Sequence, residues 1–213
     1  MAQFNTLTPQ YGWNKKAQRY YDLSSGTFVA SKDIRAALDA SIVAGKKEID
    51  NLTQKLLKSQ RSLADWQTQM AHTIKLQHVA AASLSVGGWA QATPAVWGRA
   101  GAELKKQYAF LQRLALQIES GKQPLNGSLV VRASMYGEAQ RSTYEQSRRA
   151  EMKTGGAVEE RRELHPGKTC GDCHDQAVLG WQPIGTLKRI GDSQCRMNCN
   201  CTFSYRDAQG NIL

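Results

Sequence analysis

A stripe of apolar side chains, spaced alternately by four and three residues, constrains the fold of this chain more than any other feature. Its members are Leu38, Ile42, Ile49, Leu52, Leu56, Leu63, Trp66 and Met70, with Gly45 and Ser59 at the intervening steps. This spacing keeps one face of an α-helix apolar, whereas a half-buried strand would alternate every second residue. The stripe therefore predicts a long helix, or a pair of helices, packed against other helices.

Two further helical segments are predicted downstream. Ser31 is a suitable N-cap for the first helical region, and the glycines of residues 85–89 (SVGGW) end it. Pro94 suits the first turn of a second helix, and a loop at residues 120–127 (SGKQPLNG) separates it from a third at about 129–150. The apolar or small positions of these two helices are Leu104, Tyr108, Leu111, Ala115, Ile118, Val130, Ala133, Tyr136 (or Gly137), Gln140 and Tyr144. Because such stripes are usually packing surfaces, we expect residues 31–152 to form an antiparallel helical bundle or long hairpin.

The first 30 residues are rich in aromatic side chains but show no regular period. The aromatic residues are Phe4, Tyr11, Trp13, Tyr20, Tyr21 and Phe28. Disordered segments are poor in aromatic residues, so a floppy terminus is disfavoured. We expect residues 1–30 to be an extended docking arm.

The net charge of +10 is distributed unevenly along the chain. Residues 1–66 hold ten Lys or Arg against six Asp or Glu, residues 67–137 hold seven against two, and residues 138–213 hold eleven against ten. Most of the positive excess therefore precedes the cysteines. It favours an acidic partner, either nucleic acid or an acidic protein surface, although dispersed charge can also serve solubility alone.

Membrane insertion and export are not expected. No stretch approaches the roughly 20 apolar residues of a membrane span, and the opening MAQFNTLTPQYGWNKKAQRYY lacks the apolar run of a signal peptide. We therefore expect synthesis in a reducing cytoplasm, where disulfides are rare.

The chain changes character near residues 153–164 (KTGGAVEERREL), where two glycines stop the helix and a charged, extended segment follows. Residues 153–213 are Gly-punctuated and hold all five cysteines. The last twelve residues, TFSYRDAQGNIL, alternate and then turn, which predicts a small β-hairpin. The predicted fold is thus mainly α, with long antiparallel helices followed by a small, β-containing, Cys-rich C-terminal module.

The five cysteines are spaced as two groups. Cys170 and Cys173 form a C-x2-C pair, and after 21 residues come Cys195, Cys199 and Cys201. Two groups of closely spaced thiols joined by a loop are how small domains build a tetrahedral zinc site. A segment this short has little apolar core, and a metal would add folding free energy on the order of 10 kcal/mol. We expect a structural Zn²⁺ held by four of these five cysteines, with His165 and His174 as possible substitutes.

Other interpretations of CGDCH (residues 170–174) remain. The thiols could be buried or disulfide-linked without a metal. C-x-x-C-H is also the attachment site of c-type haem, with Met197 as a candidate second axial ligand, but it leaves three cysteines unexplained. A thioredoxin-like site would need a βαβ context, and a zinc deaminase would need H-x-E before P-C-x-x-C; neither pattern is present.

The tail CGDCHDQAVLGWQPIGTLKRIGDSQCRMNCNCTFSY resembles the C-terminal end of tailed-phage minor head proteins, the head morphogenesis family. In that family a C-x-x-C pair precedes a later C-x-C, often introduced by an upstream His or Cys. Here Cys170 and Cys173 match the first pair, Cys199 and Cys201 the second, and Cys195 the upstream position. Residues 180–187 (GWQPIGTL) match the family's linker, whereas the helical body, including residues 135–145 (MYGEAQRSTYE), is similar in plan only.

The resemblance implies a non-enzymatic virion component, assembled in the host cytoplasm in several copies and associated with phage portal, capsid or neck proteins. It would act in head assembly or at the head–tail junction. A second hypothesis is a basic DNA-binding protein that contacts packaged DNA non-specifically, although the Cys-rich segment itself is charge-neutral. An enzyme is disfavoured, because there is no P-loop, H-E-x-x-H or nucleophile elbow in the sequence.

Overall fold

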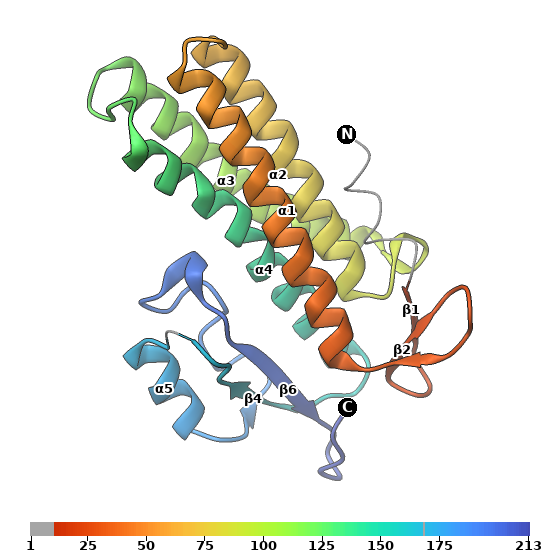
Figure 1. Ribbon diagram of the computed structural model, residues 1–213. Coiled ribbons are helices and arrows are strands. Elements are labelled where there is room, and N and C mark those ends of the chain that lie inside the picture. The colour runs from red at the N-terminus through yellow and green to blue at the C-terminus, as the bar shows by residue number, and fades with distance from the viewer. Residues whose placement is uncertain (1–10, 168) are drawn as a thin grey trace.

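The computed structural model describes residues 11–167 and 169–213. Four long helices, α1 (Ser31–Leu57), α2 (Leu63–Ser85), α3 (Pro94–Glu119) and α4 (Gly127–Thr154), form an antiparallel bundle (Figure 1). A short 3₁₀ turn, η2 (Trp89–Gln91), links α2 to α3, and α2 and α4 each pack against both α1 and α3. This confirms the predicted antiparallel bundle. None of the helices in the described residues combines the length and apolar character of a membrane-crossing helix.

The apolar stripe found in the sequence forms the centre of this bundle. The part of the stripe from Ile49 to Met70 packs in the core against side chains from α3 and α4. Trp66 is fully buried, and its indole Nε1 donates to Thr53 Oγ1 at 3.3 Å. The stripe is shared by two helices, because the chain turns at residues 58–62: Ser59 adopts a φ of 55°, and the Ser62 side chain accepts from the Asp65 N–H as the N-cap of α2.

Two glycines allow α1 to approach its neighbours closely. A Cβ at Gly45 would lie 1.8 Å from Gln77 Nε2 of α2, and a Cβ at Gly137 of α4 would lie 2.5 Å from Lys46 Cγ of α1. Neither position has space for a larger side chain without movement of its neighbour. Gly45 therefore takes a position of the apolar stripe at which α1 and α2 come into close contact.

The described part of the predicted arm is a three-stranded antiparallel sheet, β1 (Tyr11–Asn14), β2 (Arg19–Asp22) and β3 (Phe28–Val29). Trp13 and Tyr20 are buried in the second core cluster of the molecule. The Tyr20 hydroxyl lies 3.0 Å from the carbonyl oxygens of Leu84 and Ser85, at the end of α2. These aromatic residues therefore pack against this chain's own helices. The remainder of the predicted docking arm, residues 1–10, lies outside the described residues.

The Cys-rich C-terminal module follows α4. It contains β4 (Glu159–Glu163), α5 (Gly171–Val178), β5 (Gln182–Pro183), the 3₁₀ turn η3 (Arg196–Asn198) and β6 (Thr202–Arg206). The strands form an antiparallel sheet in the order β5-β4-β6. After β6 the chain turns back, and Ile212 forms an isolated antiparallel bridge with Arg206, so the predicted C-terminal hairpin is reduced to one bridge. Figure 1 shows the module beside the lower half of α4 and α1.

Polar contacts fasten this module to the bundle. Arg149 Nε of α4 lies 2.7 Å from Glu160 Oε2 of β4, whose side chain is fully buried. Arg35 Nη2 of α1 donates to the Asn200 backbone oxygen at 2.8 Å. Tyr205 of β6 is buried in the same core cluster as Trp13 and Tyr20. The module is therefore attached through both charged and apolar contacts.

Candidate metal centre

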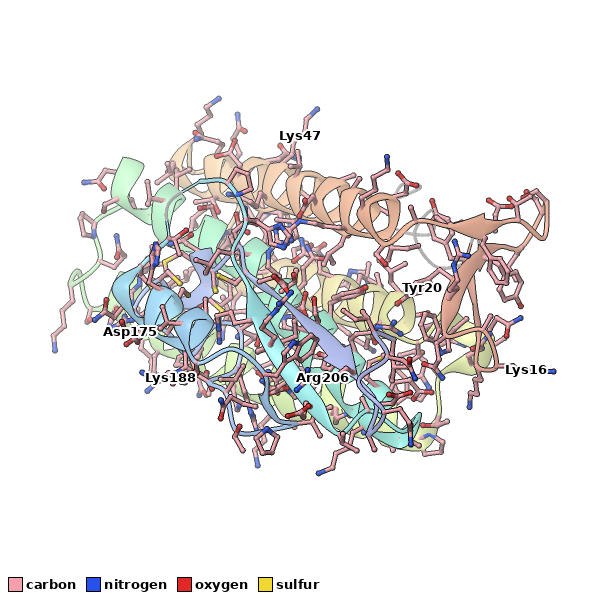
Figure 2. The ribbon with its side chains drawn as sticks, turned by 90° about the horizontal axis from the view of Figure 1, so that it is seen from below. Lys16, Tyr20, Lys47, Asp175, Lys188 and Arg206 are labelled. Atoms are coloured by element: carbon pink, nitrogen blue, oxygen red, sulfur yellow. The ribbon has the colours of Figure 1, made fainter. Side chains whose placement is uncertain are left out.

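All five cysteines of the C-terminal module meet in one place, although they come from three separate segments. Cys170 is the N-cap of α5 and Cys173 lies in its first turn. Cys195 and Cys199 flank η3, and Cys201 lies directly before β6. In Figure 2 the sulfur atoms, drawn in yellow, gather beside α5. The sequence prediction that the two cysteine groups assemble into one cluster is consistent with this arrangement.

The sulfur atoms form two overlapping sets of three. Cys170, Cys173 and Cys195 form one set, and Cys173, Cys199 and Cys201 form the other, with all sulfur atoms of a set within 4.8 Å of one another. Cys173 belongs to both sets, and its Sγ lies 3.6 Å from the Sγ of Cys195 and 3.6 Å from that of Cys199. Cys173 is therefore the centre of the cluster.

These distances fit a shared metal ion better than a disulfide. In a tetrahedral site with Zn–S bonds of about 2.3 Å, neighbouring sulfur atoms are about 3.8 Å apart. A disulfide needs about 2.05 Å between its sulfur atoms. All five cysteines are unpaired in the structure. Either set of three thiols can therefore hold a metal ion.

The thiols lie in a small, largely closed core. Cys173, Cys199 and Cys201 are buried, and Cys170 and Cys195 are partly exposed. Ile190 is buried among them, and the partly buried Leu164 and Phe203 complete the apolar surroundings. Few large apolar side chains surround the thiols directly, because other buried apolar residues of the module, Leu187 and Tyr205, lie outside this cluster. This shortage is consistent with a bound metal as part of the fold.

A buried arginine lies against the sulfur atoms. Arg162 of β4 is 2% exposed, and its Nη1 lies 3.7 Å from Cys173 Sγ and 3.8 Å from Cys199 Sγ. Its Nη2 donates to the Lys188 backbone oxygen. A guanidinium in this position stabilises negative charge on the sulfur atoms, as neighbours hydrogen-bonded to metal ligands commonly do. Four thiolates around a divalent ion carry a net charge of −2, which Arg162 offsets in part.

Two guanidinium groups contact the ring of Phe203. Arg149 and Arg162 lie 4.2 and 5.1 Å from its centroid. These cation–π contacts hold Arg162 between β6 and the cysteines. The same residue of β6 therefore connects the cluster to Arg149 of α4 and so to the bundle.

Hydrogen bonds within the cluster lower the pKa of some thiols and raise the pKa of others. The Cys201 thiol and, more weakly, its backbone N–H lower the pKa of Cys199 to about 4, against the effect of burial. Conversely, the hydrogen bond to Cys199 together with burial raises the pKa of Cys201, and burial raises the pKa values of Cys195 and Cys173. Against the effect of burial, hydrogen bonds involving Cys173 and Cys195 also lower the pKa of Cys170. A metal ion displaces the protons that remain on such thiols as it binds.

The two histidines considered as substitute ligands lie outside both sulfur sets. His165 Nε2 lies 2.8 Å from Thr202 Oγ1, so this histidine has a structural hydrogen-bond partner. His174 lies exposed on α5. Among the described residues, the grouped metal-ligating side chains are cysteines alone.

The sequence did not identify Arg162 and Glu160 as part of this region. Both belong to β4, where alternate side chains point inward, and both are almost fully buried. The sequence EERRE gave little indication that its second and fourth residues are buried, because charged residues are seldom fully buried unless they are paired. Their role depends on Arg149 and on the sulfur atoms, which are distant in the sequence.

Comparisons with known proteins do not identify the chain: no protein-family model, curated protein or solved structure gives a significant match.

Proposed function

We propose that this chain is a non-enzymatic structural component of a tailed-bacteriophage virion, a minor head protein or a portal- or neck-associated protein, with a C-terminal module stabilised by one Zn²⁺. The closed thiol cluster carries the proposal. When four protein sulfur atoms surround a zinc ion, no coordination position is left for a substrate, so the ion has a structural role. The resemblance of the tail to phage minor head proteins supplies the virion context.

Zinc is the metal that suits this set of ligands best. Thiolates select soft or borderline ions, and a tetrahedral all-sulfur site suits Zn²⁺ or iron. The 3.6 Å spacing of Cys173 Sγ from two other sulfur atoms suits ligands of a single ion. Elemental mass spectrometry of the full-length, tag-free protein should therefore find about one zinc per chain. Iron in equal amount, or the absence of any metal, would contradict the proposed cofactor.

The virion assignment is tested separately. Particles made from the genome that encodes this chain should be purified through a density gradient and analysed by quantitative mass spectrometry. We expect the chain at low copy number relative to the major capsid protein, and cross-links to portal or neck proteins. Intact, infectious particles that lack the chain would refute the virion proposal and would leave the zinc result unaffected.

A further inference from the structure

Two cavities of about 420 and about 670 Å³ lie next to each other along α3 and α4. Both are lined by Glu103 and Lys106, so they adjoin at these two residues and together make one depression. Its walls are α3, α4 and residues 184–197 of the C-terminal module. We call this depression the α3–α4 groove.

The groove concentrates positive charge. Eight Lys or Arg residues and two Asp or Glu residues line it, a net charge of +6 in a chain whose total is +10. The basic residues are Arg99, Lys106, Arg113, Arg132, Arg149, Lys153, Arg189 and Arg196. The acidic residues are Glu103 and Asp192. A single-sign field of this kind attracts a partner of opposite charge.

The fold assembles this charge from distant parts of the sequence. Arg99, Lys106 and Arg113 of α3 are spaced by seven residues, about 10.5 Å along a helix, and therefore share one face. The charge-neutral module contributes Arg189 and Arg196 to the opposite wall. Lys188, in contrast, pairs with Asp172 at 3.1 Å.

Several of these cations are not neutralised within the chain. In the described parts of the sequence, Arg99, Lys153 and Arg196 form no ion pair with a carboxylate, and Arg99 Nε is buried without a hydrogen-bond partner. Lys106 and Arg149 do have acidic partners, Glu103 and Glu160. The groove thus keeps charge available for an external acceptor.

The larger cavity also offers an apolar surface. Phe110, Met135, Tyr136 and Met197 line it together with the basic residues. Phe110 is 46% exposed, although Arg113 lies 4.8 Å from its ring centroid. Methionine side chains adapt their shape to apolar ligands. The groove therefore combines apolar side chains with basic ones.

We propose that the α3–α4 groove binds an acidic amphipathic segment of a partner protein, with its carboxylates paired with the basic side chains and its apolar side chains against Met135, Met197 and the exposed part of Phe110. Between Arg99 and Arg113 the groove spans about 21 Å, roughly four helical turns. A single-stranded nucleic acid would need a series of open aromatic faces for base stacking. Here Tyr136 is buried, and Arg113 covers the Phe110 ring at 4.8 Å.

The inference rests on the proposed structural role for its biological context, but it is tested on the isolated full-length protein. The probe is a fluorescent peptide of about 18 residues in which Leu forms one helical face and Glu the others, roughly 27 Å long as a helix. Controls are a peptide of the same composition in scrambled order and a single-stranded oligonucleotide of about 20 nucleotides. Fluorescence anisotropy at physiological salt should show micromolar binding of the amphipathic peptide and weaker binding of the other two.

Two sets of variants locate the binding. The groove variant combines Arg113→Gln, Lys153→Gln and Arg196→Asn, because Arg196 has a φ of 48° that Asn tolerates. The matched control combines Lys32→Gln, Lys47→Gln and Lys75→Gln, which removes the same charge from exposed positions outside the groove; Lys47 projects outward from α1 (Figure 2). We expect the groove variant to weaken peptide binding about tenfold and the control less than about twofold.

Phe110→Ser separates the apolar contribution from charge. This substitution should weaken the binding of the amphipathic peptide severalfold and leave the binding of the scrambled peptide unchanged. The proposal would be overturned if the groove and control variants lost peptide affinity equally. It would also be overturned if the oligonucleotide bound more tightly than the amphipathic peptide and Phe110→Ser left that binding unchanged. The absence of peptide binding would overturn it as well. None of these outcomes bears on whether the chain is found in virions, so the two proposals fail independently.

Discussion

The helical bundle and the Cys-rich C-terminal module are stabilised in different ways. The bundle contains a continuous apolar core in which Ile49, Trp66, Met70 and Ile74 are fully buried. The module has few large apolar residues, and its interior holds thiols and the charged side chains of Glu160 and Arg162. Hydrophobic burial can account for the first region, whereas the second contains buried ion pairs and, by our proposal, a Zn²⁺ bound to its thiols. The two regions should therefore respond to different perturbations.

Removal of the central cysteine should have the largest effect. Cys173→Ser takes one ligand from both sulfur sets, and the zinc-dependent folding free energy of such a module is on the order of 10 kcal/mol. We expect loss of the metal and rapid proteolysis of residues 158–213, while far-UV circular dichroism shows that the bundle remains helical. Unchanged protease resistance of the module would show that it does not depend on the cluster.

The other four cysteines provide the matched controls, because five thiols compete for four positions. Single Ser substitutions of Cys170, Cys195, Cys199 and Cys201 should give three variants that lose zinc and one that retains it. The variant that still binds zinc identifies the cysteine that is not a ligand. If all four retain zinc, the ion is not held by these sulfur atoms.

The reciprocal experiment perturbs the bundle. Trp66→Ala removes the largest fully buried side chain and should lower the free energy of unfolding of the bundle by about 3–5 kcal/mol. Zinc content should stay at one per chain, as measured on protein folded at low temperature. Exposed Trp89, which is 59% accessible, is the control; its ring centroid lies 4.6 Å from that of Trp97, so Trp89→Ala should cost no more than about 1.5 kcal/mol. Joint loss of zinc and helicity in Trp66→Ala would mean that the two regions fold as one unit.

One of the contacts between the two regions is the buried ion pair of Arg149 with Glu160. Glu160→Gln keeps an oxygen to accept the Leu187 N–H, which lies 3.1 Å away in the native chain, but leaves Arg149 without its carboxylate. Breaking a buried pair in this way costs about 3 kcal/mol or more. Hydrogen exchange should show faster opening of β4 and β6 with α2 unaffected. Glu159→Gln, which breaks the more exposed pair with Arg206, should cost less than about 1 kcal/mol.

The sequence predicted the bundle well because its information is local. Each step of the Leu38–Met70 stripe specifies the same helical face, and the burial of Leu38, Ile42 and Ile49 follows from that spacing. The turn at Ser59 was harder to predict, since residues 58–62 contain no Gly or Pro. The polar interior contacts, such as Gln77 over Gly45, depend on the register between helices, which a single sequence does not specify.

The metal centre was predictable only in part. Closely spaced cysteines indicated the ligands, and their spacing was sufficient to suggest one cluster. The surroundings were not predictable, because Arg162 and Phe203 reach the thiols only after β4 and β6 have paired. The α3–α4 groove is a still more distant consequence of folding: Arg113 and Arg196 are 83 residues apart in the sequence, as their numbers give, and both line the same cavity.

The smallest effect concerns two buried titratable groups of the bundle. Burial lowers the pKa of His78 to about 4, and its Nδ1 lies 2.7 Å from Thr143 Oγ1. Burial raises the pKa of Glu145 to about 7, although nearby arginines oppose the shift. Between about pH 4.5 and 6.5 the unfolded chain binds a proton at His78 that the folded chain does not, so this group makes stability rise with pH. Over the same interval the folded chain holds a proton at Glu145 that the unfolded chain has lost, so this group makes stability fall with pH.

The two contributions should nearly cancel in the native protein and become visible in single variants. Each amounts to about 1 kcal/mol per pH unit near pH 5.5. Relative to the native chain, Glu145→Gln should therefore gain stability as the pH rises from 5 to 6, and His78→Gln should lose it, as measured by urea unfolding at each pH. Any pH dependence of the metal centre is common to all three proteins and drops out of the difference. Parallel profiles for both variants would mean that these groups titrate normally, and that the interior of the bundle is wetter than its packing indicates.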